Sequence, residues 1–236
     1  MKKSRLLFLL IIPLWVLILA ALLLPAPEDA PIPADSTAFG TLTVYEDQAG
    51  FLARTSFVRY DKEYAGLPVE CFDAAADGRI ALGFKTRDGL RYAAVLDAEG
   101  RFQYGFSFAC TGAFQLDWRE EGLGVYWVRS GVLGVFDGTG SCLAMYEADT
   151  GRESSRHITA LGKAARLLPD GSVLRLRNPE GLLSRFCSGY QQLVRIAPDG
   201  TEHILYDAPG GTLPVFAILL ILIAALGSIV LYKRLA

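Results

Sequence analysis

Two long segments without a charged side chain, one near each end of the 236-residue chain, limit most strongly what it can fold into. Residues 6–24 form a run of 19 uncharged, mostly apolar residues, and residues 213–232 form a run of 20. A helix needs about 20 such residues to cross the apolar core of a bilayer. The sequence therefore predicts two transmembrane helices embedded in membrane lipid.

The basic residues beside these segments predict their orientation. Positive charge next to a span stays on the cytoplasmic side of the membrane. The five flanking basic residues are Lys2, Lys3, Arg5, Lys233 and Arg234. We therefore expect a cytoplasmic-membrane protein with both termini, residues 1–5 and 233–236, in the cytoplasm and residues 25–212 outside it. The alternative for the first segment is a cleaved signal, but the apolar core of a signal is typically about 7–15 residues long.

The two spans offer little for transport chemistry. They contain no Asp, Glu, Lys, Arg or His, whereas ionisable groups usually mark an ion or substrate path through a membrane. The second span carries a patch of small residues that could let a helix of a membrane-protein partner approach closely. The patch consists of Ala224, Ala225, Gly227 and Ser228. The alternative is that such residues simply occur in spans.

The region between the spans is acidic. Without the five flanking basic residues it keeps 23 − 5 = 18 Lys and Arg against 25 Asp and Glu, a formal charge of −7. Binding to nucleic acid needs a basic surface, so we expect no nucleic-acid partner.

The same region divides into three parts. Residues 25–37 are rich in proline and predict an extended spacer, and residues 207–212 predict a short linker. Between them, residues 38–206 alternate short apolar runs with Gly, Asp and Asn turns, which is typical of an all-β domain. The pattern predicts no helix within this domain.

A repeated pattern further specifies the β-domain. Three strand-forming segments follow an acidic residue and a glycine, starting at Asp77, Glu121 and Asp170, and they are 44 and 49 residues apart. Each is followed by a second strand, a turn closed by glycine, and another strand. Such units bury their faces by stacking around an axis, as in β-propellers, whose blades have four strands. We expect a small or irregular propeller-like domain, with residues 38–76 as a degenerate fourth unit; a β-sandwich is the alternative.

The stretch that begins at Asp77, with its "AAVLD" strand and "DAEGRF" turn, resembles a blade of NHL-type and related β-propellers. The segments "GVFDGTGSCLAMY" and "VRIAPDGTEHILY" are similar. The resemblance implies a platform that binds a ligand or a protein, and it brings no catalytic residues.

All four cysteines lie in the exported region, where disulfides can persist. Stacked repeats would favour the pairs Cys71–Cys110 and Cys142–Cys187 among the three possible pairings. The alternative is that some of these cysteines are small buried hydrophobic residues.

No motif in the sequence specifies catalysis, a cofactor or a metal. His157 and His203 stand alone in strand-like sequence, and there is no GxSxG segment that would nominate a serine nucleophile. The stretch "DAAADG", residues 73–78, lacks central and terminal ligands of a calcium loop. Asp117 with Glu120 or Glu121 is the one close carboxylate cluster that could serve as a hydrolase pair.

Three functions are compatible with these features. The favoured one is a non-enzymatic binding or scaffolding module displayed outside the cytoplasm, as an accessory subunit of a membrane complex. The second is an envelope hydrolase that uses the loop carboxylates. The third is a sensory input module; since the predicted cytoplasmic ends are short, it would signal through a partner.

Overall fold

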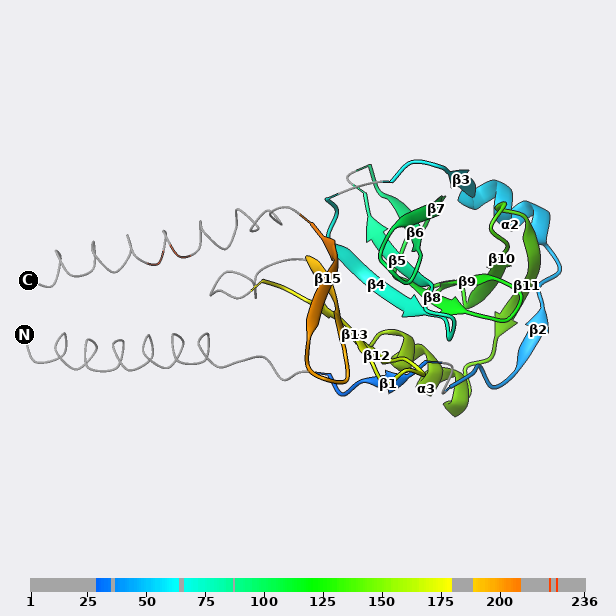
Figure 1. Ribbon diagram of the computed structural model, residues 1–236. Coiled ribbons are helices and arrows are strands. Elements are labelled where there is room, and N and C mark those ends of the chain that lie inside the picture. Colours follow the sequence, from blue (N-terminus) through cyan, green and yellow to red (C-terminus); the bar gives the residue numbers. More distant parts are fainter. Residues whose placement is uncertain are drawn as a thin grey trace, which may run out of the picture. The chain divides into compact units, whose positions relative to one another are not determined.

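The computed structural model describes residues 29–34, 37–63, 66–86, 88–179 and 189–208, together with Ile221 and Ala224. The chain divides into two units, and the one formed by Asp29–Asn178 and Ser188–Gly211 contains every named strand and helix (Figure 1). The two predicted spans, apart from Ile221 and Ala224, lie outside the described residues. Among the residues that are described, no helix is long and apolar enough to cross a membrane.

The described domain consists of three five-stranded sheets, so its fold is all-β and propeller-like. The first sheet contains β3 (Val58–Tyr60), β4 (Val69–Ala74), β5 (Ile80–Lys85), β6 (Leu90–Leu96) and β7 (Phe102–Ala109). The second contains β2 (Leu42–Val44), β8 (Phe114–Trp118), β9 (Leu123–Trp127), β10 (Val132–Phe136) and β11 (Cys142–Ala148). The third contains β1 (Ile32–Pro33), β12 (Ala165–Leu167), β13 (Val173–Arg177), β14 (Gln192–Ile196) and β15 (Glu202–Asp207).

Each sheet is built on four strands that are consecutive in the chain and antiparallel, namely β4–β7, β8–β11 and β12–β15. The three repeats read from the sequence are therefore confirmed. The fourth unit, expected in residues 38–76, is not a sheet of its own. Its strands β2 and β3 instead join the outer strands β11 and β7, and β4 begins the first repeat. From within the predicted spacer, β1 pairs in parallel with β12.

The turns follow the predicted chemistry. Gly100, Gly140 and Gly200 each close a hairpin with φ near +85°, a backbone conformation that costs glycine little. In the turn before Gly140, the Asp137 carboxylate accepts hydrogen bonds from the backbone N–H groups of Thr139 and Ser141, at 2.8 and 3.0 Å. Asp137 is therefore a turn residue, as the sequence indicates.

The first sheet lies between the other two and is buried on both faces. Successive residues of a strand point to opposite faces: Ala81, Ala93 and Val95 pack toward the second sheet, and Ile80, Leu82 and Leu96 pack toward the third. Burial of apolar surface on both faces is the main favourable contribution to the free energy that holds the three sheets together. On β7, Phe106 and Phe108 face the second sheet, whereas Phe102 faces the third, because the register with β6 shifts beside Tyr104.

Two helices occur where none was expected. Helix α2 (Gln48–Thr55) buries Phe51 and Thr55, and its N-cap Asp47 accepts a hydrogen bond from the N–H of Gly50 at 3.1 Å. Helix α3 (Arg152–Leu161) connects β11 to β12. It buries Ser154, His157 and Leu161, which lie on one face because they are three and four residues apart. Because the residues of this buried face are largely polar, the sequence shows no apolar periodicity that would predict the helix. Helix α3 lines one side of the site described next.

Candidate functional site

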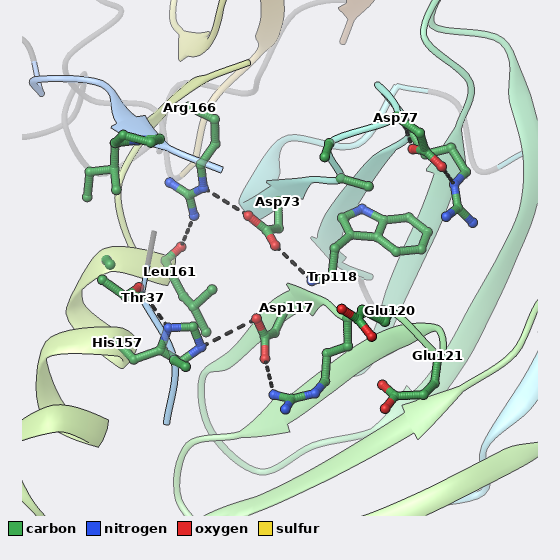
Figure 2. Close-up of a pocket in the computed structure, with 18 residues that line it drawn as sticks. Thr37, Asp73, Asp77, Asp117, Trp118, Glu120, Glu121, His157, Leu161 and Arg166 are labelled. Atoms are coloured by element: carbon green, nitrogen blue, oxygen red, sulfur yellow. Dashed lines mark hydrogen bonds and ion pairs between the residues drawn. The ribbon is translucent and has the colours of Figure 1, made fainter. Parts of the chain in front are cut away.

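A cleft of about 650 Å³ opens where the first strands of the three repeats end (Figure 2). Its lining comes from β4 and β8 with the turns that follow them, from β12, and from the second half of α3. The segments 32–33 and 37–38 complete it. Pockets for small ligands typically measure about 300–1,000 Å³, so this cleft has the size of a ligand site.

Three charged residues of the lining occupy equivalent positions in the repeats. Asp73, Asp117 and Arg166 lie on β4, β8 and β12, and each stands five residues before the glycine of the turn that follows its strand. Those glycines are Gly78, Gly122 and Gly171. Extending the repeat alignment five residues upstream of the turn glycine would therefore have identified these positions from sequence. The repeats as predicted begin at their turns, so Arg166 was not among the predicted site residues.

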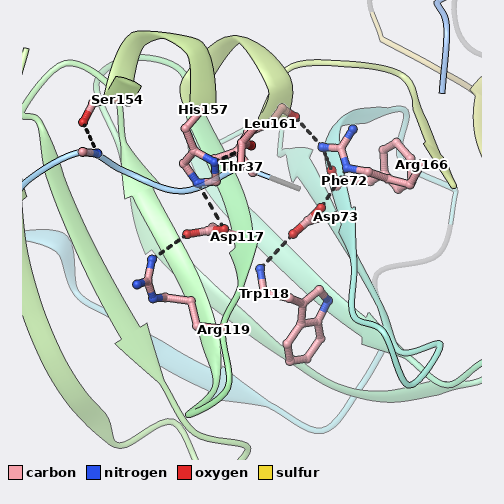
Figure 3. Close-up of polar contacts among 11 residues, drawn as sticks. Thr37, Phe72, Asp73, Asp117, Trp118, Arg119, Ser154, His157, Leu161 and Arg166 are labelled. Carbon is pink, nitrogen blue, oxygen red and sulfur yellow. Dashed lines mark hydrogen bonds and ion pairs between the residues drawn. The ribbon is translucent and has the colours of Figure 1, made fainter. Parts of the chain in front are cut away.

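Arg166 and Asp73 form a buried ion pair that joins the third sheet to the first (Figure 3). Nε of Arg166 donates to Oδ1 of Asp73 at 2.9 Å, and their side chains are 4% and 9% exposed. The other carboxylate oxygen accepts the backbone N–H of Trp118, on the second sheet, at 2.8 Å. Burial raises the pKa of Asp73 to about 6, although Arg166 and the Trp118 amide act in the opposite direction. Both oxygens of Asp73 are thus occupied by contacts that link all three sheets.

Asp117 and His157 form the second polar group in the cleft. Oδ2 of Asp117 accepts a hydrogen bond from Arg119 at 3.1 Å. Nε2 of the buried His157 lies 3.3 Å from Oδ1 of Asp117 but lacks hydrogen-bond alignment. On its other side, Nδ1 of His157 is 2.8 Å from Oγ1 of Thr37. His157 therefore lies on a helix, not on the strand that its sequence context predicts, and it fixes segment 37–39 against α3 together with an edge contact to Phe39.

The mouth of the cleft combines an aromatic ring with carboxylates. Arg79 lies over the indole of Trp118, with 4.5 Å from its guanidinium carbon to the ring centre, and pairs with Asp77 at 2.7 Å. Glu120 and Glu121 also line the cleft and are exposed. Neither glutamate has an ion-pair partner within the part of the chain that the structure describes. The predicted carboxylate cluster is thus brought into one cleft, but Asp117 lies inside it and the glutamates lie at its mouth.

Two buried nitrogen atoms of the lining make no aligned hydrogen bond among the described residues. They are Nε1 of Trp118 and Nε2 of His157, on side chains that belong to residues 5% and 3% exposed. A buried polar group without a partner costs about 1–3 kcal/mol. Such groups in a cleft can be satisfied by a bound molecule.

The other candidate residues lie apart from this chemistry. In the stretch compared with a calcium loop, Asp73 forms the ion pair with Arg166, whereas Asp77 accepts a hydrogen bond from the backbone N–H of Arg79 within the turn, at 3.0 Å. No group of three or more His, Cys, Asp and Glu that could hold a metal occurs among the described residues. His203 is exposed on β15.

The predicted Cys71–Cys110 disulfide is absent from the structure, in which both residues are free thiols. The physical reason is that they belong to one sheet: Cys71 lies on the edge strand β4 and Cys110 follows β7, with β5 and β6 between. Three strand spacings amount to about 14 Å, whereas bridged cysteines have Cα atoms within about 7 Å. Because Cys142 is a free thiol, the predicted Cys142–Cys187 disulfide is not formed in the structure either; Cys187 itself lies outside the described residues.

No family model matches this chain, and no curated protein matches it. A solved structure of catalytically inactive virginiamycin B lyase from Staphylococcus aureus with quinupristin has 11% identity and a TM-score of 0.26, covering 67% of this chain and 47% of that one. A streptogramin B lyase structure has 14% identity and a TM-score of 0.25, covering 65% and 46%. This chain thus spans about half the length of both. The resemblance to NHL-type blades is supported only as an all-β, propeller-like fold.

Proposed function

We propose that this chain is a membrane-anchored binding protein, whose β-repeat domain stands outside the cytoplasm and takes its ligand in the cleft at the first turns of the repeats. The observation that carries the proposal is the convergence of three equivalent positions, Asp73, Asp117 and Arg166, on the lining of one cleft of ligand size. The anchoring rests on the apolar segments 6–24 and 213–232.

Binding is favoured over catalysis by the way the interior charges are used. Asp73 is engaged by Arg166 and by the amide of Trp118, and Asp117 by Arg119. A carboxylate that acts as acid, base or nucleophile needs an oxygen within reach of the reacting atom. These carboxylates instead fix the walls of the cleft, which suits a preformed binding site.

An envelope hydrolase is the second candidate. It is favoured by the position of Asp117, Glu120 and Glu121 in the lining of one cleft. If this function is correct, Glu120→Gln and Glu121→Gln should reproduce the phenotype of the null strain while the protein remains folded. A wild-type phenotype from both variants would contradict it.

Co-purification tests the binding function. The full-length protein, extracted from its own membranes in mild detergent, should carry a small molecule or a partner chain that native mass spectrometry detects. Ala76→Trp fills the cleft, since Ala76 is an exposed part of its lining, and should abolish this association. Ala49→Trp, at an exposed position of α2, is the matched control and should retain it. Recovery of a lone protein from wild type, or equal association in both variants, would contradict the proposal.

A further inference from the structure

We infer that the cleft binds a positively charged organic group, a guanidinium or an ammonium, that carries a hydrogen-bond acceptor nearby. This inference rests on the proposed function, because it specifies the ligand chemistry of the same cleft. Three independent features of the lining support it.

The first feature is an excess of negative charge. Five carboxylates and three guanidinium groups line the cleft, and they are Asp73, Asp77, Asp117, Glu120, Glu121, Arg79, Arg119 and Arg166. Each of the three arginines pairs with one of the three aspartates. Glu120 and Glu121 are left over at the mouth. A cleft that concentrates charge of one sign attracts the opposite charge, and the −7 charge of residues 25–212 adds to this attraction.

The second feature is an aromatic surface that already holds a guanidinium. Arg79 lies 4.5 Å from the ring centre of Trp118, which is the geometry of a cation–π contact. The Arg79 side chain is 48% exposed and its ion pair is to Asp77, two residues away in the same turn. Arg79 can therefore leave the ring without disturbing the fold. Its guanidinium occupies the position on the ring that the cation of the ligand would take.

The third feature is a buried indole nitrogen, Nε1 of Trp118, that has no hydrogen-bond partner among the described residues. An indole N–H can only donate, so it requires an acceptor. A cation alone cannot supply one, and a ligand with a carbonyl or hydroxyl beside its cationic group can. An arginine or lysine residue of a peptide combines the two, and so does a small hydroxylated amine.

Calorimetric titration of the full-length protein in mild detergent tests this inference. The probes are N-acetyl-arginine amide and its neutral isostere N-acetyl-citrulline amide. Hydrogen bonds to charged groups are stronger than hydrogen bonds between neutral groups. We therefore expect the arginine amide to bind at least about tenfold more tightly than the citrulline amide. Butylguanidine has the guanidinium and no second charge but lacks the amide carbonyls; weaker binding of butylguanidine supports the need for an acceptor, and equal binding overturns that part.

Variants locate the site. Glu120→Gln combined with Glu121→Gln should remove the preference for arginine amide over citrulline amide. Glu46→Gln combined with Glu147→Gln neutralises two exposed glutamates outside the cleft and should preserve it. Arg79→Ala should strengthen binding of the arginine amide by roughly two- to fivefold, because the ring no longer carries its own guanidinium.

The outcomes separate this inference from the proposed function. Equal binding of the two amides, or binding of neither, overturns the inference. The binding function fails only if wild-type protein carries no cleft-dependent ligand or partner in the co-purification experiment. A neutral co-purified ligand that is lost in Ala76→Trp would therefore preserve the binding function and refute the cationic ligand.

Discussion

Replacing Arg166 with methionine removes the guanidinium that joins β12 of the third sheet to β4 of the first. Arg166 also donates to the backbone carbonyl groups of Phe72, Leu161, Lys163 and Ala165 at 3.0–3.3 Å. The variant leaves the carboxylate of Asp73 buried without its counter-charge. Removal of one partner of a buried ion pair typically costs about 3–5 kcal/mol, so we expect Arg166→Met to lower the free energy of unfolding by about that amount.

Urea denaturation of the full-length protein in mild detergent, followed by tryptophan fluorescence, measures this loss. The signal suits the purpose because Trp118 and Trp127 are buried in the folded domain, at 5% and 3% exposed, and unfolding exposes them to water. Arg101→Met is the matched control: Arg101 pairs with Asp97 and Glu99, but its side chain is 72% exposed. Exposed ion pairs contribute little to stability, so this variant should remain close to wild type.

The double variant Asp73→Leu with Arg166→Met sharpens the result. Apolar residues often replace a buried ion pair at little cost, so the double variant should be more stable than Arg166→Met alone. A loss below about 1 kcal/mol in Arg166→Met, or equal losses in Arg166→Met and Arg101→Met, would refute the conclusion that this pair holds the sheets together at the cleft.

Three further results are expected. Burial raises the pKa of Asp73 from 3.8 to about 6. Protonation of Asp73 therefore contributes to the free energy of unfolding in full below about pH 4, and this contribution is lost as the pH rises through 6. Asp73→Asn should therefore flatten the dependence of the unfolding free energy on pH between 4 and 6, and an unchanged slope would contradict this. A Cβ at Gly83 would lie 2.5 Å from the sulfur of Cys71 and 2.7 Å from the ring of Phe114; Gly83→Ala should cost about 1–3 kcal/mol in urea denaturation through overpacking, and a neutral effect would argue against close packing of the first two sheets. Cys71 is buried, which raises the pKa of its thiol, so mass spectrometry should show alkylation of Cys71 by iodoacetamide only in denaturant; modification of the native protein would place it at the surface.

The repeats could be predicted because their signal is local. Turn glycines and aspartates followed by apolar strands recur from Asp77, Glu121 and Asp170 onward, and each turn is decided by a few residues. The short strands β2 and β3 could not be placed in the same way. Their pairing with β11 and β7 depends on contacts distant in sequence, so they resembled the remains of a fourth repeat.

The candidate site was harder to predict, since its parts come from separate repeats. Asp73 lies in a stretch that resembles a calcium loop, and its partner Arg166 is 93 residues away. Asp117 was recognised as a candidate, but its contacts with Arg119 and His157 were not. Helix α3 was missed because its buried face consists largely of Ser154 and His157, which give no apolar periodicity.

Hydrogen exchange of the full-length protein, with and without the ligand or partner that co-purifies with it, tests most directly whether the cleft is the binding site. We expect slower exchange in the first turns of the repeats, residues 75–79 and 118–122, which line or adjoin the cleft. The second-hairpin turns at residues 97–101 and 137–141 lie outside its lining and should exchange at unchanged rates. Protection confined to those second-hairpin turns, with none at 75–79 or 118–122, would contradict the assignment of function to this cleft.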